Sequence, residues 1–361
     1  MSAPYSPAPP PGGSPWASPA GWHAARTAAF ARAQRSNGHP ATNGHRHEPI
    51  PAAAPPATRL IRQPGPFAHA FSPDAAPIGS VRLGEVVAIE TSDCFGGRLT
   101  REDQIPSAVL GDAPLNPVTG PIWVEGAEPG DTLVVHIDGI ESTRDWAVSC
   151  LLPFCGGLTV SHEAPMLTGQ LPERVWLYRR TPGGFAWRDR WEIPWAPFFG
   201  TIGTAPARGA VATDTPGPHG GNMDVPEATV GRTLHLPVQV PGALFYVGDA
   251  HAAQGQGELG GPALEIAAVG TFRFDLIKGR PIAWPRIDSE TAIMTVGSGR
   301  PMEDAARIAC HELVGWLAAE HGFDPLDAYQ VLTQVAGLSV AQMVNPAYTV
   351  VASCPKCYLQ H

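Results

Sequence analysis

Charged residues are scarce in this chain, and it has neither a basic excess nor a long apolar run. Asp, Glu, Lys and Arg make up only 16% of its 361 residues, and the net charge is −9. Nucleic-acid-binding proteins normally carry a basic patch, so this balance argues against that class. No apolar stretch approaches the roughly 20 residues of a membrane span, and no charged start plus apolar segment marks a secretory signal. We therefore expect a cytoplasmic protein with no nucleic-acid partner and no membrane partner.

Cysteine is also sparse, which excludes a disulfide scaffold for a chain of this length. The six cysteines are Cys94, Cys150, Cys155, Cys310, Cys354 and Cys357. The CPKC segment at 354–357 has no second CxxC partner, so we interpret it as a local or fortuitous feature rather than a zinc ribbon. The GxSxG elbow of serine hydrolases and the Walker and dinucleotide fingerprints are absent as well.

Glycine and proline, in contrast, are abundant, with 40 residues of each. Such punctuation favours short strands and turns over long helices. Residues 1–57 are a Pro/Ala/Gly-rich, low-complexity extension that we predict to be disordered, and 58–361 are predicted to form the folded domain. Within the extension, 21–36 could form a transient helix or a docking helix, and three histidines (His39, His45, His47) are interpreted as solvated rather than metal-binding.

From residue 66 onward the pattern is that of β-strands separated by Pro-Gly turns. Helices are predicted only late, over 300–322 and from a cap at Asp324 to about Gly337. The segment SVAQMVNPAYTVVASCP is predicted to be a short helical turn followed by a final strand. We therefore predict an α+β, β-rich fold with a late helical pair.

Four polar segments interrupt the predicted strands. They are IETSDCFGG with Asp93, NPVTGPIWVEGAEPGD with Asn116, TPGPHGGNMDVPE with His219, Asn222 and Asp224, and GDAHAAQGQGELGG with Asp249, His251, Gln254 and Glu258. Polar side chains and glycines at strand ends are how loops on a rigid scaffold build a site. Asp93, Asp224, His251 and Glu258 are of the residue types that bind a catalytic divalent metal. Their spacing alone does not decide the matter.

A cysteine nucleophile is the alternative at this stage. Cys155 in LPFCGGL precedes two glycines whose N–H groups could stabilise an oxyanion. A thiol needs a base to become a thiolate, however, and no sequence rule pairs Cys155 with a histidine. We interpret it as a small buried apolar residue.

Five blocks, in register over about 65–355, resemble the acetamidase/formamidase family. They are ETSDCFGG, NPVTGPIWVEGAEPGDTLVVHI, PGPHGGNMDV, LFYVGDAHAAQGQGE and AQMVNPAYTVVA. The resemblance implies hydrolysis of a short aliphatic amide, formamide or acetamide, to a carboxylate and ammonia. It also implies two interwoven β-sheet halves, a homo-oligomer and a bound divalent metal. The chain departs from the pattern at Gln256, where an acid is expected, and in its N-terminal extension.

On this basis we predict metal-assisted attack by water. Asp93, His251 and Asp224 are the predicted ligands of a divalent ion, zinc or else calcium. Glu258 is predicted to take the proton of the water and pass it to the leaving nitrogen, with His251 and Asn222 also catalytic.

His219, Gly220 and Gly221 are the predicted substrate-binding residues. Two alternatives remain open: an amidase that uses Cys155 or Cys94 without metal, and a non-catalytic protein that binds small amides.

Overall fold

The structure is a computed structural model that describes residues 56–57, 59–158, 171–188 and 190–359. Contacts divide the chain into two units, 1–48 and 49–361, and every described residue belongs to the second. The predicted extension, with its helix and histidines, lies outside the described residues except for 56–57. The boundary at residue 57 therefore stays a prediction.

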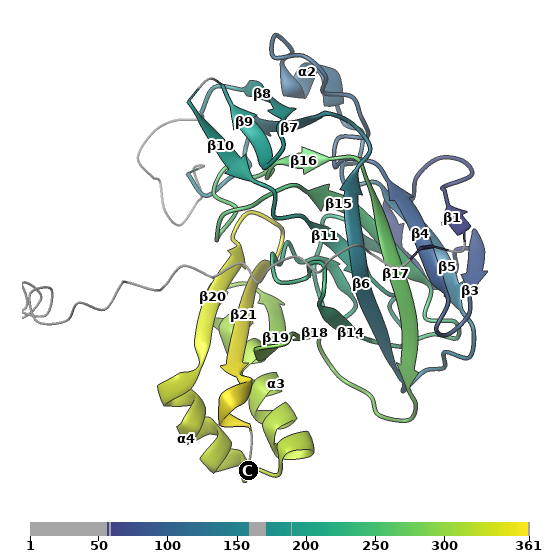
Figure 1. The fold of residues 1–361 in the computed structure, drawn as a ribbon, viewed down its shortest axis with the longest axis vertical. Helices are drawn as coiled ribbons and strands as arrows, with labels where there is room; N and C mark the ends of the chain where they lie inside the picture. The colour runs from purple at the N-terminus through teal and green to yellow at the C-terminus, as the bar shows by residue number, and fades with distance from the viewer. Residues whose placement is uncertain (1–55, 58, 159–170, 189, 360–361) are drawn as a thin grey trace, which may run out of the picture. The chain divides into compact units, whose positions relative to one another are not determined.

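The first sheet has nine strands and extends from the right of the described unit to its lower left in Figure 1. Its strand order is β1 (Arg59–Ile61), β4 (Val86–Thr91), β17 (Ala268–Ile277), β6 (Thr132–Ser142), β14 (Thr233–Pro237), β18 (Arg286–Asp288), β19 (Ala292–Gly299), β21 (Tyr348–Pro355) and β20 (Gly337–Gln342). All its neighbouring strands pair antiparallel except β1 and β4.

The second sheet has ten strands and carries most of the polar segments singled out in the sequence. Its main path is β10 (Trp191–Pro194), β9 (Gly184–Trp187), β8 (Arg174–Arg180), β7 (Trp146–Leu151), β16 (Glu265–Ile266), β15 (Phe245–His251), β11 (Phe198–Gly203) and β13 (Gly220–Asn222), with β5 (Val118–Val124) beside β15 and β3 (Gly79–Val81) beside β5. A separate pair joins β2 (Ala70–Phe71) to β12 (Val211–Ala212).

The two sheets pack face to face around one hydrophobic core. Along their strands, residues that point into this core alternate with residues that point away from it. On β17, every second residue from Ala268 to Phe274 is buried. Phe272 of β17 meets Phe199 of β11 with ring centroids 5.3 Å apart, and Phe274 meets Phe245 of β15 at 5.0 Å. Figure 1 shows β6 and β17 crossing in front of β11 and β15. This core holds β15 and β11 rigidly, and both strands lead into the site described below.

Both late helices are present, as predicted. Helix α3 (Met302–His321) ends at Gly322 in the left-handed conformation, and α4 (Pro325–Val335) begins at Asp324, whose side chain accepts from two backbone amides. The remaining helices among the described residues are short, α2 (Pro106–Leu110) and the 3₁₀ turn η1 (Lys356–Tyr358). No helix in the described part of the chain has the length and apolar character needed to cross a membrane.

The predicted helical turn before the last strand is wrong. Residues 337–342 form β20, which pairs antiparallel with β21. Contacts with the following segment explain the difference: Ala341 and Gln342 are buried at the end of β20, and the Gln342 side chain bonds to Thr349 and Ala347 of the returning segment. Pairing with β21 therefore outweighs the helical propensity of SVAQMV.

Candidate active site

Four buried carboxyl groups gather around one buried histidine at the end of β15. Asp249 and His251 are two residues apart on β15, so their side chains lie on the same face. Glu265 of β16 is the direct cross-strand neighbour of His251. Asp224 follows β13, and Glu258 comes from the loop after β15; all five residues are buried. We call Asp224, Asp249, Glu258 and Glu265, with His251 between them, the acid cluster.

One nitrogen of His251 faces the carboxylates, while the other is held by an amide. Nε2 lies 3.3 Å from Asp249 Oδ1, 3.4 Å from Glu265 Oε2 and 4.0 Å from Asp224 Oδ1. Nδ1 lies 2.9 Å from Gln254 Oε1. The Gln254 amide nitrogen donates to the carbonyls of Asp224 and Ala341, so its oxygen must accept from His251. In the neutral ring the lone pair is therefore on Nε2 and points into the acid cluster.

The pKa values reflect this crowding of negative charge. Burial alone would lower the pKa of His251, but the charges of Glu265 and Asp249 raise it to about 10. Burial and the neighbouring Asp249 raise the pKa of Asp224 to about 7. Burial also works against ionisation of Asp249, yet the charge and hydrogen bonds of His251 hold its pKa below the usual value.

The two glutamates resist ionisation most strongly. Burial, together with the charge of Asp224, raises the pKa of Glu258 well above its usual value. Burial also raises the pKa of Glu265, and the opposing charge of His251 does not cancel the effect. Glu265 Oε2 is buried, accepts no hydrogen bond from an N–H group and lies 3.4 Å from His251 Nε2, while the Glu265 carboxyl shares a hydrogen bond with Asp249. A carboxylate oxygen left this way implies that a proton or a cation completes the site.

The backbone at the site adopts an uncommon conformation. Asp224, Asp249 and Glu258 have φ values of 48°, 53° and 49°, and Asn116, which lines the same cavity, has 52°. These are left-handed conformations that non-glycine residues seldom adopt, and such residues gather at functional sites. In this backbone conformation the four side chains converge on the same region of the site.

Donor atoms in the acid cluster are close enough to share a metal ion. Three groups have ligand atoms that all lie within 4.8 Å of one another: Asp224, Asp249 and His251; His251, Glu258 and Glu265; and Cys94, Asp249 and Glu265. His251 offers only Nε2, so it can serve the first or the second group but not both ions at once. Two or three His and carboxylate ligands with room for water are the donor set of a catalytic zinc site.

Gly200 of β11 forms the floor beneath these donors. A Cβ there would lie 2.3 Å from Asp224 Oδ1 and 2.9 Å from Asp249 Oδ2. Only a glycine lets the strand pass this close to the two carboxylates.

Amide and hydroxyl groups donate hydrogen bonds to the Asp224 and Asp249 carboxylates. Asn345, in the loop between β20 and β21, donates to Asp224 Oδ2 at 2.5 Å, and Thr201 Oγ1 donates to Asp249 Oδ2 at 3.1 Å. The orientation of the Asn222 amide that satisfies its neighbours places Nδ2 2.7 Å from Asp249 Oδ2 and 3.2 Å from Asp224 Oδ1. These contacts fix the carboxylates without adding a positive charge.

The structure places Asp93 apart from the acid cluster. Its Oδ1 accepts from the backbone amides of Phe95 and Gly97, and its Oδ2 lies 2.5 Å from an Arg144 nitrogen. Asp93 thus holds the turn that carries Cys94, and it belongs to none of the three donor groups.

The predicted substrate residues His219, Gly220 and Gly221 do not line the cavity at the acid cluster either. His219 is buried edge-on against Phe71, and burial lowers its pKa to about 4.

A cavity of about 240 Å³ opens onto the acid cluster. It is lined by Cys94, Phe95, Leu115, Asn116, Leu152, Cys155, Asp214, Asn222, Asp249, Glu258, Gly261, Pro262, Glu265, Val344, Asn345 and Pro346. Polar groups thus form the floor and apolar side chains the walls, as in a site for a small organic molecule.

Both cysteines considered as nucleophiles line the same cavity. Burial and the nearby Glu265 raise the pKa of Cys94, and burial raises the pKa of Cys155. The only histidine of the acid cluster has Nδ1 committed to Gln254 and Nε2 directed at carboxylates. Neither thiol therefore has the electropositive surroundings that produce a thiolate.

Sequence reasoning missed three residues of the site. Glu265 lies in the apolar run ALEIAAVG, where a single acid within a buried strand was the available signal. Asp249 stood beside His251 in the sequence but was not assigned as a ligand. Asn345 lies far along the chain from both, and its only signal was its place in the fifth block, AQMVNPAYTVVA.

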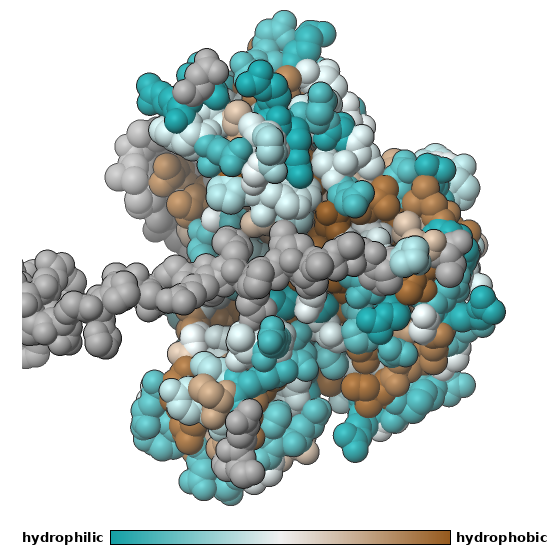
Figure 2. All heavy atoms as spheres, viewed as in Figure 1, coloured by the Kyte–Doolittle hydropathy of each residue, from teal (hydrophilic) through white to brown (hydrophobic). Residues whose placement is uncertain are grey.

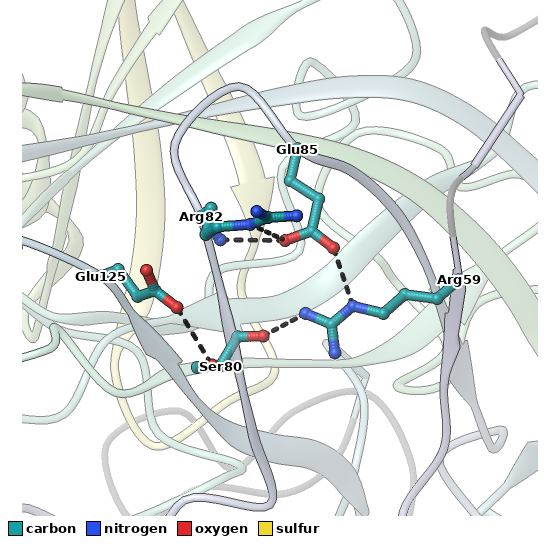
Figure 3. Close-up of a pocket in the computed structure, with 5 residues that line it drawn as sticks. All are labelled: Arg59, Ser80, Arg82, Glu85 and Glu125. Carbon is teal, nitrogen blue, oxygen red and sulfur yellow. Dashed lines mark hydrogen bonds and ion pairs between the residues drawn. The ribbon is translucent and has the colours of Figure 1, made fainter.

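A second pocket lies on the surface and is drawn in Figure 3. We call it the surface pocket; it is lined by Arg59, Ser80, Arg82, Glu85 and Glu125. Arg59 Nε donates to Glu85 Oε1 at 2.8 Å, and the Arg82 amide donates to Glu85 Oε2 at 3.0 Å. These contacts lower the pKa of Glu85 to about 2.

The fold and this site define a known class. A family model described as the Acetamidase/Formamidase family matches residues 57–215 and 202–356, so the chain belongs to that family. The crystal structure of an acetamidase from Yersinia enterocolitica superimposes with a TM-score of 0.79 at 38% identity, covering 82% of this chain and 90% of that one. An acetamidase structure from Bacillus halodurans gives 0.76 at 32%, covering 83% and 98%. The predicted family and fold class are confirmed.

The sequence relatives include a formamidase and an acetamidase. The formamidase of Methylophilus methylotrophus is 28% identical over 267 residues, which are 60% of this chain and 65% of that protein. The acetamidase of Mycolicibacterium smegmatis is 26% identical over 270 residues, 59% and 66% respectively. The chain therefore spans just under two thirds of the length of these relatives.

Proposed function

We propose that this protein hydrolyses a short aliphatic amide to its carboxylate and ammonia. The observation that carries the proposal is the His251 ring, whose Nε2 is directed at buried carboxylates on the floor of a small cavity. The names of its relatives, formamidase and acetamidase, support the same reaction. A protein that only binds amides would gain nothing from four buried acids, three of which resist ionisation.

We further propose that a divalent metal, zinc by its mixed donor set, is held by Asp224, Asp249 and His251. The lone pair on His251 Nε2 and the adjacent carboxylates of Asp224 and Asp249 fit such an ion. Asp249 takes the place that the sequence suggested for Asp93, because the Asp93 carboxylate is engaged by Arg144. A nitrogen ligand favours zinc over calcium, which prefers oxygen. When bound, the ion would lower the pKa of a coordinated water and polarise the substrate carbonyl.

In this proposal Glu258 is the proton carrier. It lines the cavity beside the acid cluster, where a carboxylate can take a proton from water and deliver it to the departing nitrogen. Gln254 holds His251 in the tautomer that presents Nε2. Asn222 and Asn345 keep the Asp224 and Asp249 carboxylates in place.

Ammonia release, measured before and after exhaustive chelation, tests the proposal. We expect activity on formamide or acetamide that chelation abolishes, that added Zn²⁺ restores, and that thiol alkylation leaves largely intact. The reverse pattern would support Cys94 or Cys155 as the nucleophile, and no ammonia from any amide would support a binding protein.

Replacement of Glu258 by Gln separates the proton carrier from the ligands. We expect Glu258→Gln to lower kcat by about 10³-fold with metal content unchanged. Glu128→Gln, at an exposed glutamate, is the matched control. Full activity in Glu258→Gln would remove Glu258 from this role.

We also propose that the protein is a cytoplasmic homo-oligomer. Leu60 on β1, Leu83 in the turn before β4 and Trp123 on β5 are large and exposed, and their elements lie at the same edge of Figure 1. Figure 2 shows hydrophobic residues gathering on this side, whereas the surface over α2 and β8 is mostly hydrophilic. Contiguous apolar surface marks contact sites, and six free cysteines suit a reducing compartment. Sedimentation velocity tests the oligomeric state.

A further inference from the structure

The cavity above the acid cluster is larger than formamide or acetamide requires. Liquid water occupies about 30 Å³ per molecule, so a volume of about 240 Å³ corresponds to roughly eight waters. Formamide and acetamide have only about three and four non-hydrogen atoms. Either would leave about half of this space to water.

The unused space is apolar. Phe95 is fully buried, and Leu115, Leu152 and Val344 are half-buried side chains whose surfaces line the cavity. Pro262 and Pro346 complete the wall. Asp214, the charged residue outside the floor, is itself exposed and marks the mouth rather than the wall. Water beside such a wall is displaced favourably by an alkyl group.

The polar floor determines which end of a substrate lies deepest. The carboxyl groups of Asp249, Glu258 and Glu265 provide several hydrogen-bond acceptors at the floor. An unsubstituted CONH₂ group has two N–H donors and one carbonyl acceptor, so it matches this floor better than an N-alkyl amide with a single N–H. The alkyl part of the substrate would then point toward Leu115 and Leu152.

We infer that the preferred substrate is a primary amide whose acyl group is an alkyl chain of about three to five carbons, packed against Phe95, Leu115 and Leu152. This inference rests on the proposed function and specifies its substrate class.

The test is kcat/KM for the metal-loaded full-length protein on formamide, acetamide, propionamide, butyramide and N-propylacetamide. Each buried methylene should raise kcat/KM about fourfold, so butyramide should exceed acetamide by roughly fifteenfold. N-propylacetamide should be the poorer substrate. A kcat/KM that is highest for formamide or acetamide, or a preference for N-propylacetamide, would overturn the inference and leave amide hydrolysis standing. No turnover of any amide would overturn the proposed function as well.

A Leu152→Phe variant narrows the cavity and locates the alkyl group. We expect it to lower kcat/KM for butyramide at least about tenfold and for acetamide less than about twofold. Leu338→Phe, at an exposed leucine of β20, is the matched control and should leave both values unchanged. Equal losses on both substrates, with an unchanged circular dichroism spectrum, would place the alkyl group elsewhere and overturn the assignment. Leu115→Phe repeats the measurement from another part of the wall should Leu152→Phe fail to fold.

Discussion

The acid cluster and the surface pocket both contain carboxylates, but their charges are balanced in opposite ways. In the surface pocket Arg59 and the Arg82 amide meet Glu85 directly, and its pKa falls to about 2. In the acid cluster four carboxyl groups surround one imidazole, and the pKa of Asp224 rises to about 7. Among the described residues no Lys or Arg side chain forms an ion pair with those four acids.

The difference shows which of the two regions lacks the positive charge needed to balance its carboxylates. A buried carboxylate is stable only when it is paired, hydrogen-bonded or protonated. In the surface pocket the Arg59 side chain balances the Glu85 carboxylate, so this pocket does not need a bound cation. The acid cluster meets this condition only in part, which is the property expected of a cation-binding catalytic site.

The strongest test of this comparison removes one acid from each region. Asp249→Asn keeps the size of the side chain but takes away a proposed ligand, so we expect ammonia release to fall on the order of 10⁴-fold and bound metal to be lost. Glu85→Gln, the matching change in the surface pocket, should retain full activity and full metal content. Elemental analysis with an ammonia assay checks both variants. Retention of metal by Asp249→Asn would show that the ion is held by another donor group.

A smaller effect is expected from the residue that orients His251. Gln254→Leu removes the acceptor for Nδ1–H, which frees the ring to turn or to change tautomer. Such second-layer contacts are typically worth 10- to 100-fold in metal affinity, so we expect a loss of about that size. Competition with a zinc indicator measures it. Gln239→Leu, which removes an exposed bond to the Ala207 amide, should have no effect.

Close packing under the acid cluster should appear in stability as well. In Gly200→Ala the new methyl group would displace Asp224 and Asp249, and overpacking of this kind costs about 1–3 kcal/mol in the free energy of unfolding. Gly65→Ala, whose methyl group would meet nothing within 4 Å, should change the free energy far less. Urea unfolding of both variants decides this prediction. Equal stabilities would mean that the floor at Gly200 can relax.

The smallest effect concerns pH and the surface pocket. Because the folded protein lowers the pKa of Glu85 from 4.5 to about 2, the Arg59–Glu85 pair stabilises the fold above about pH 4.5. That contribution is lost as the pH falls from about 4.5 toward 2. Arg59 is partly exposed, so we expect no more than about 1 kcal/mol. The stability difference between wild type and Glu85→Gln, followed from pH 7 to pH 2, should shrink over this window.

Much of the architecture could be predicted because local signals and tertiary packing agree. Pro-Gly turns before apolar runs indicated β6 and β15, and the Asp324–Pro325 pair indicated the start of α4. The prediction failed at β20, where SVAQMV has no local feature to separate a helical turn from a strand. Only the partner strand β21 supplies the hydrogen bonds that decide it.

The site divides in the same way. The sequence by itself determined that His251, Glu258 and Asp224 are polar residues at strand ends, in segments with little apolar surface to bury. Composition and turn residues are local properties, so a short stretch of sequence is enough to show this. Only the tertiary structure decided that Glu265 lies with them in the acid cluster and that Asp93 instead pairs with Arg144. Cross-strand register and the meeting of distant loops set the distances between charges, and no short stretch of sequence encodes those distances.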